Sequence, residues 1–218
     1  MNQLFYLIID CSDVQYKQQA RSTVEILNVL RPHENLESLH ISHHSGTTCP
    51  NWMMSLRNLR SIILVDWYNC EFLPPLGKLP YLEELSLWVM QKVKKIGGEF
   101  LGIVDQDYAM SLKLSSSSSS FFPKLKQLGI YSMSALEEWE VGVEGWNKED
   151  SEISIMPCLS SLEISCCKNL TTLPDFLCKT PVQELIIWGC LNLSERCQQG
   201  SGEEWPKISH IPNIKISS

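Results

Sequence analysis

The chain has 218 residues, 44% of them hydrophobic, a formal net charge of −7 at pH 7 and a pI near 5.3. Its Lys and Arg residues are scattered, so it lacks the clustered basic footprint of a nucleic-acid-binding surface. No apolar run approaches the roughly 18 residues of a membrane-spanning helix. We therefore expect no nucleic acid and no membrane span.

The N-terminal residues and the cysteines bear on the compartment. The apolar run from Leu4 to Ile9 lacks a basic flank and is followed by Asp10, which makes it a poor secretory signal. The nine cysteines are odd in number and show no disulfide-scaffold spacing, as in a reducing compartment. None of them forms a C-x-x-C pair, so we expect no metal site. These features predict a cytoplasmic protein.

Aliphatic residues recur at positions 1, 4 and 6 of eight short windows, in the pattern L-x-x-L-x-L. The windows begin at Leu4, Leu36, Leu59, Leu82, Leu125, Leu159, Val182 and Ile211. Successive first positions lie 32, 23, 23, 43, 34, 23 and 29 residues apart, and the value of 23 is typical of a leucine-rich repeat. Residues 1–218 are therefore predicted to form a single α/β domain, a leucine-rich-repeat solenoid.

Each window should place its positions 3 to 7 in a short strand, with positions 4 and 6 in the core and positions 3, 5 and 7 on the concave face. About eight such strands would stack into a parallel concave sheet. Prolines in several turns disfavour long convex helices, so we expect an irregular, loop-rich convex side. One exception is predicted near the N-terminus, where Val24, Leu27 and Val29 or Leu30 have helical spacing before Pro32.

Two insertions interrupt the repeats. The first, at about residues 103–121, holds the serine run Ser115 to Ser120 and is predicted to be a mobile loop, because it has too little apolar surface to order itself. The second, at about residues 137–152, is strongly acidic. It is either a docking loop for a partner or a solvated loop that keeps the protein soluble.

Four segments between and across the repeats resemble a known family. They are RPHENLESLHISHHSGTTCPNWMM (31–54), NCEFLPPLGKLPYLEELSLWVMQKVKKIGGEFLG (69–102), FPKLKQLGIYSMSALEEWE (122–140) and MPCLSSLEISCCKNLTTLPDFL (156–177). Together they resemble the leucine-rich-repeat region of the coiled-coil-type, nucleotide-binding, leucine-rich-repeat immune receptors of plants, over most of the chain from Arg31 onward. The elements PPLG-x-LP and KKIGGEFLG carry most of this specificity. Two departures from the family pattern are Cys49, in place of Phe, and Trp67, in place of the repeat's capping Cys.

The resemblance implies a sensor in plant defence. Its partner would be a pathogen effector, a guarded host protein or the receptor's own nucleotide-binding domain. No G-x-x-x-x-G-K-[ST] loop occurs in the sequence. We therefore expect no cofactor in this chain, which is interpreted as a truncated portion of such a receptor. ADP or ATP is expected only for the nucleotide-binding domain of the parent family.

The concave positions are the candidate binding residues. Large aromatic side chains on an exposed strand face are typical of interface hot spots. The candidates are Trp88, Tyr131, Trp188, Glu84, Glu184, Ile63, Ile186, Glu163 and His40. The alternative is that the aromatic side chains fold onto one another or are covered by the insertions.

Other function classes have less support. No residue pattern marks a nucleophile with its base, so we do not expect an enzyme. The main alternative is an F-box-type leucine-rich-repeat adaptor that selects substrates for ubiquitination, although no F-box-like helical segment precedes the repeats. A second alternative is an extracellular receptor domain, which would require a signal peptide and cysteine caps.

Overall fold

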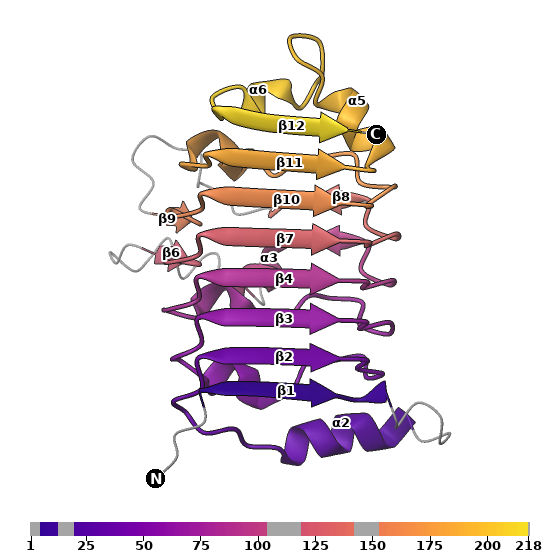
Figure 1. The fold of residues 1–218 in the computed structure, drawn as a ribbon, viewed down its shortest axis with the longest axis vertical. Coiled ribbons are helices and arrows are strands. Elements are labelled where there is room, and N and C mark those ends of the chain that lie inside the picture. Colours follow the sequence, from indigo (N-terminus) through magenta and orange to yellow (C-terminus); the bar gives the residue numbers. More distant parts are fainter. Residues whose placement is uncertain (1–4, 13–19, 104–118, 142–152, 218) are drawn as a thin grey trace.

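The structure, a computed structural model, describes residues 5–12, 20–103, 119–141 and 153–217. Its main feature is one eight-stranded sheet that runs from one end of the molecule to the other (Figure 1). The strands are β1 (Tyr6–Asp10), β2 (Ser38–Ser42), β3 (Ser61–Val65), β4 (Glu84–Trp88), β7 (Gln127–Tyr131), β10 (Ser161–Ser165), β11 (Glu184–Trp188) and β12 (Asn213–Ser217). Each one covers the predicted positions 3 to 7 of its window. The leucine-rich-repeat solenoid predicted from the sequence is therefore confirmed.

The strands are all parallel and pair in repeat register. Leu85 of β4 lies opposite Leu128 of β7, although 43 residues separate the two windows, and Leu128 lies opposite Leu162 of β10. Each rung therefore presents the same position to its neighbours. Insertions are accommodated in the connections, and the core row of the sheet continues without a break.

Alternation within each strand places the core on one side of the sheet. Leu85 and Leu87 of β4 are 1% and 0% exposed, whereas Trp88 next to them is 39% exposed. The outermost strands differ, because Leu7 of β1 and Ile214 of β12 occupy core positions but are only partly buried. A terminal rung has a neighbour on one side only.

Position 8, just after each inner strand, has a left-handed backbone. The φ angles there lie between 55° and 64° in His43, Asp66, Val89, Ser132, Cys166 and Gly189. This conformation turns each N–H toward the next rung, so that Val89 donates to the carbonyl of Tyr131 and Cys166 to that of Trp188. Five of the six are not glycine, and each accepts the steric cost of a left-handed conformation to extend the ladder beyond the strand.

Position 9 supplies buried caps. Cys167 and Cys190, which keep the repeat's cysteine, donate from Sγ to the carbonyls of Ile130 and Ile164 on the preceding rung, at 3.9 and 3.6 Å. Trp67 replaces the cysteine, yet its indole N–H donates to the equivalent carbonyl of Ile41 at 3.3 Å. The departure at Trp67 therefore preserves the cap.

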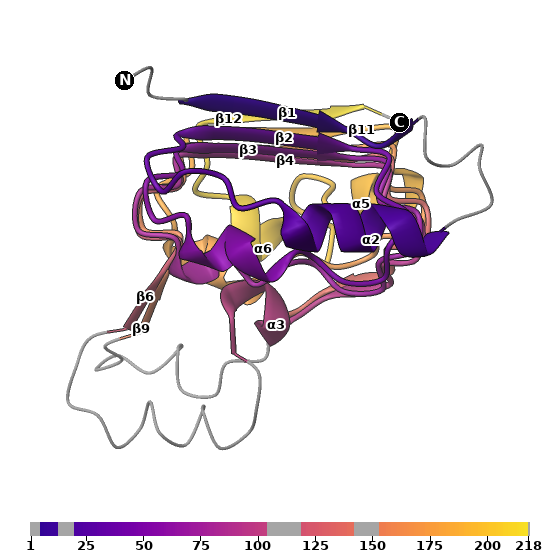
Figure 2. The same cartoon turned by 90° about the horizontal axis from the view of Figure 1, so that it is seen from below.

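The described parts of the connections lie together on one side of the sheet, as the end-on view shows (Figure 2). They contain three 3₁₀ turns and short helices, as the prolines predicted. These are η1 (Asn51–Ser55), η2 (Leu76–Lys78), α3 (Gly98–Leu101), η3 (Asp175–Lys179), α5 (Leu191–Arg196) and α6 (Trp205–Ile208), together with a two-stranded sheet of β5 (Lys95–Ile96) and β8 (Glu138–Trp139).

The predicted N-terminal helix is present as α2 (Ala20–Val29). Leu27 is fully buried, as the helical spacing indicated. Val29 and Leu30, at and just after the end of the helix, are 79% and 37% exposed. No helix in the described residues is long and apolar enough to cross a membrane.

The described edges of the two insertions are more ordered than the sequence suggested. Ser119 and Ser120, at the end of the serine run, belong to β6 (Ser119–Phe121), which pairs with β9 (Ile153–Ile155). The loop prediction is wrong for these two serines, because a partner strand satisfies their backbone. Glu138 and Glu140 of the acidic insertion form ion pairs with Lys95, each at 3.3 Å. The rest of both predicted loops, residues 104–118 and 142–152, lies outside the described residues.

Candidate functional site

The concave face of the sheet consists of rows of side chains that run across the strands. Position 5 contributes Ile8, His40, Ile63, Ser86, Gly129, Glu163, Ile186 and Lys215. Position 7 contributes Asp10, Ser42, Val65, Trp88, Tyr131, Ser165, Trp188 and Ser217. The two rows are adjacent, and their largest side chains lie on β4, β7 and β11.

Trp88 and Tyr131 occupy neighbouring rungs and stack. Their ring centroids are 3.9 Å apart and their planes differ by 15°. For this pair, the aromatic side chains therefore do fold onto one another, as the alternative stated in the sequence analysis describes. Even so, Trp88 remains 39% exposed, and Trp188, two rungs beyond Tyr131, is 55% exposed.

Gly129 allows the ring of Tyr131 to lie down on the sheet. A Cβ at position 129 would overlap the Tyr131 ring, whose nearest atoms include the hydroxyl oxygen. The ring therefore occupies the space that a side chain at position 5 would fill. This directs the hydroxyl toward the next rung.

Glu163 accepts a hydrogen bond from that hydroxyl group. Tyr131 donates to Oε2 of Glu163 at 2.9 Å, and the Ser165 hydroxyl donates to Oε1 at 3.2 Å. Burial, followed by the hydrogen bond to Glu163, raises the pKa of Tyr131 to about 12, so the phenol stays a donor at neutral pH. Ile186 lies opposite Glu163, and Trp188 opposite Ser165. We call Trp88, Tyr131, Glu163, Ile186 and Trp188 the concave cluster.

The other predicted site residues lie outside this cluster. Glu84 and Glu184 share strands with Trp88 and Trp188, but four residues of extended chain, at about 3.3 Å each, place them roughly 13 Å away. Glu184 forms an ion pair with Lys215 at 2.8 Å, and Glu84 accepts a 3.5 Å hydrogen bond from Ser61.

His40 and Ile63 lie next to each other on β2 and β3, nearer the N-terminal end of the sheet. The half-buried His40 has no hydrogen-bond partner for Nε2 among the described residues. The structure thus brings five of the nine predicted residues together and places the other four elsewhere on the concave face.

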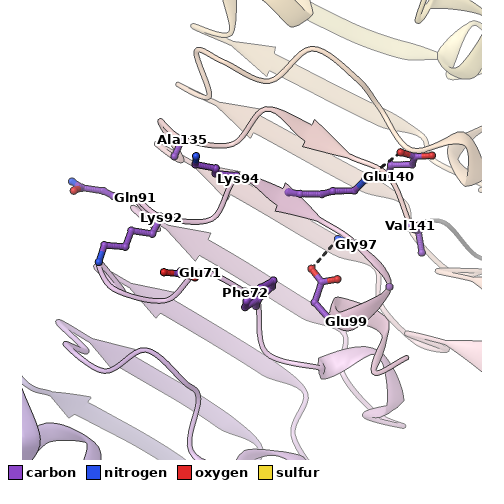
Figure 3. A pocket seen from close by; sticks show the side chains of 12 residues that line it. Glu71, Phe72, Gln91, Lys92, Lys94, Gly97, Glu99, Ala135, Glu140 and Val141 are labelled. Carbon is purple, nitrogen blue, oxygen red and sulfur yellow. Dashed lines mark hydrogen bonds and ion pairs between the residues drawn. The ribbon is translucent and has the colours of Figure 1, made fainter. Parts of the chain in front are cut away.

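A groove of about 690 Å³ lies on the other side of the molecule, in the connections of β3, β4 and β7 (Figure 3). Phe72, which lines it, is 66% exposed. Four of its polar groups are already paired within the fold, since Lys95 pairs with Glu140 and the Gly97 N–H donates to Glu99 at 3.0 Å. Phe72 lies outside the repeat positions, so the repeat pattern does not mark it as a candidate.

Two of the cysteines near the C-terminal rungs, Cys167 and Cys190, are structural. Cys167 and Cys190 are buried on adjacent rungs, and the Cys167 N–H donates to Sγ of Cys190 at 3.2 Å. The hydrogen bond to Cys190, together with burial, raises the pKa of Cys167. Among the described residues, no group of three His, Cys, Asp or Glu side chains is placed to hold a metal ion.

Eight parallel rungs with a common register, buried caps and irregular connections define a leucine-rich-repeat protein. Residues 2–90 match the family of R13L1/DRL21 leucine-rich repeats. The chain therefore belongs to the leucine-rich-repeat proteins, and its repeats are similar to those of plant disease-resistance proteins.

Three relatives illustrate this similarity. The disease resistance protein RGA2 of Solanum bulbocastanum is 28% identical over 88% of this chain, which covers 28% of RGA2. RPP13-like protein 1 of Arabidopsis thaliana is 30% identical over 73% of the chain, and RGA4 of S. bulbocastanum is 35% identical over 66%. The chain covers 14% and 13% of the lengths of these two proteins. No solved structure matches the chain.

Proposed function

We propose that the chain is a protein-recognition module of a plant immune receptor and that it acts in the cytoplasm. The relatives are named as disease-resistance proteins, which supports a role in plant defence. The partner is a pathogen effector, a guarded host protein or a nucleotide-binding domain of the receptor itself.

The exposure of the concave aromatic side chains is the observation that carries this proposal. Trp188 is 55% exposed and Trp88 is 39% exposed on a sheet face that the described parts of the connections do not cover (Figure 2). Two large rings in contact with water on a rigid sheet are costly in a protein without a partner. In an interface, such rings supply much of the binding free energy at little entropic cost.

The mechanism is differential binding. A partner that binds the concave face in only one state of the receptor shifts the equilibrium toward that state. If the partner is the nucleotide-binding domain, the contact holds the receptor inactive. If it is an effector or a host protein, binding competes with that contact and releases it.

The test is binding between this chain and the portion of RGA2 outside the matched region, where the resemblance predicts the nucleotide-binding domain. We expect the double variant Trp88→Ala/Trp188→Ala to weaken binding by about 2 kcal/mol or more, as hot-spot residues do. The matched control is Phe72→Ala, which removes an exposed ring from the convex side. Circular dichroism must show that all the variants are folded.

The outcomes separate the alternatives. Loss in the concave variant alone supports recognition through the concave face. Equal binding by the wild type and the concave variant, or loss in Phe72→Ala alone, contradicts it for this partner. The F-box-type alternative would require binding to a ubiquitin-ligase scaffold, which the same proteins can be used to measure.

A further inference from the structure

Glu163 is the ionisable centre of the concave cluster. On β4, β7, β10 and β11, Glu163 is the only acidic or basic residue at positions 5 and 7. No ion pair links it to a described Lys or Arg residue, in contrast to Glu184, which pairs with Lys215, and Glu83, which pairs with Arg60 and Lys126. Within the described part of the chain, the carboxylate of Glu163 therefore has no paired cation.

The carboxylate is nonetheless held in position. Neutral hydroxyl groups of Tyr131 and Ser165 each donate to one of its oxygens. A carboxylate has about four acceptor sites, so each oxygen keeps one for a ligand. A half-buried anion that is oriented but not neutralised is well suited to bind a partner's cation.

Aromatic residues occupy the rungs on both sides of the place where such a cation would lie. Ser165 is only 7% exposed, and its neighbours in the position-7 row are Tyr131 on one side and Trp188 on the other. A cation above Ser165 would be one rung, about 4.8 Å, from each of those two strands. Attraction between a cation and a ring operates within about 6 Å of the ring centroid.

We infer that the concave cluster binds its partner through an arginine side chain, whose guanidinium lies above Ser165, pairs with Glu163 and contacts the rings of Tyr131 and Trp188. The inference rests on the proposed function, since it names the chemistry of the segment that the concave face binds. Arginine fits better than lysine, because its planar guanidinium forms paired hydrogen bonds with a carboxylate and also stacks on aromatic faces. The partner is a protein segment with an exposed arginine.

Three short peptides test the inference directly. They have the form acetyl-Gly-Gly-X-Gly-Gly-amide, where X is arginine, citrulline or lysine. Citrulline has nearly the shape of arginine but no charge. Binding is followed by NMR through the indole N–H signals of Trp88 and Trp188, assigned with the single alanine variants.

We expect the arginine peptide to shift the Trp188 signal in a saturable manner. The citrulline peptide should bind about tenfold or more weakly, since it lacks the charge-assisted bond, and the lysine peptide should bind with intermediate affinity. Glu163→Gln should weaken arginine binding by a similar factor and remove the difference between arginine and citrulline. The control Glu138→Gln, an exposed carboxylate on the convex side, should bind as the wild type does.

Several results would overturn the inference. They are no shift of Trp188 at the highest soluble concentration of the arginine peptide, equal affinity for arginine and citrulline, or unchanged affinity in Glu163→Gln. The RGA2 measurement separates this failure from failure of the proposed function. If the double tryptophan variant loses the partner and Glu163→Gln keeps it, the concave face binds protein without using arginine.

Discussion

At position 9, a residue that differs from the repeat pattern can still form the capping hydrogen bond. Trp67 is much larger than cysteine, yet it is fully buried, packs against His44 in a tilted arrangement with ring centroids 4.7 Å apart, and donates to the carbonyl of Ile41. Burial lowers the pKa of His44, which favours its neutral form. The cap depends on a donor in the right place rather than on one residue type.

Replacing this tryptophan should be costly. Trp67→Ala removes a buried ring and the cap hydrogen bond, so we expect a loss of about 3–5 kcal/mol in the free energy of unfolding. Trp188→Ala removes a ring that is 55% exposed and should change stability by about 0.5 kcal/mol or less. Urea unfolding followed by circular dichroism measures both. Equal losses would mean that Trp188 also belongs to the core.

Val89 carries backbone strain that a substitution can relieve. Its φ is 56°, a conformation in which a β-branched residue is an outlier and which asparagine tolerates. Val65 serves as the matched control, because it is half-buried like Val89 but lies within strand β3. We expect Val89→Asn to be more stable than Val65→Asn by about 1–2 kcal/mol, the cost of a left-handed residue. Equal stabilities in urea unfolding would show that position 8 is not strained.

At the scale of strands, a row of alternating charges links successive rungs at position 2. Arg60 lies between Glu37 and Glu83, at 3.8 and 2.7 Å, and Lys126 reaches Glu83 at 2.6 Å. The same residues carry the backbone ladder, since the N–H groups of Glu83 and Glu84 both donate to the carbonyl of Arg60. These ion pairs therefore reinforce the backbone pairing at the start of the strands.

This row makes a pH-dependent contribution to stability. The hydrogen bond from Lys126 is the largest cause of a lowered pKa for Glu83. A carboxyl group with a lowered pKa in the folded state stabilises it above the ordinary pKa, and this stabilisation is lost as the pH falls through the lowered value. Glu83→Gln should therefore lose less thermal stability than the wild type between about pH 6 and pH 3. The control Glu71→Gln should follow the wild type, and identical slopes for all three proteins would contradict the prediction.

Elements that depend on the repeat period could be predicted, whereas those that depend on distant pairing could not. The eight strands follow from aliphatic residues at fixed positions, because each side chain's direction is set by strand alternation. Ser119 and Ser120 are locally typical of a loop. They form a strand because Ile153 and Ser154, 34 residues further along the chain, provide the partner.

At the scale of the whole molecule, stability should vary along the solenoid. Each rung contacts only its neighbours, and the end rungs have one neighbour instead of two. The core residues of β1 and β12 are accordingly only partly buried. Native-state hydrogen exchange should show the slowest amides in β4, β7 and β10 and faster exchange in β1 and β12. Uniform protection across the sheet would indicate a single cooperative unit instead.

The sequence predicts which strand face carries the candidate site residues, but not which of their side chains lie together. The repeat register places Trp88, Tyr131 and Trp188 on one face, which the sequence alone indicates. The orientation of Tyr131 over Gly129 toward Glu163 depends on side-chain packing between rungs, which a single repeat does not reveal. Glu84 and Glu184 share strands with tryptophans in the sequence, but strand length separates them from the rings.

Recognition through the concave face can be tested by a footprint of the complex, because a footprint locates the partner without altering the chain. Hydroxyl-radical labelling, read by mass spectrometry, reports the solvent exposure of Trp88, Trp188 and Phe72 with and without a bound partner. If the concave face binds the partner, Trp88 and Trp188 become protected and the labelling of Phe72 stays unchanged. Protection of Phe72 with unchanged labelling of both tryptophans would contradict recognition through the concave face.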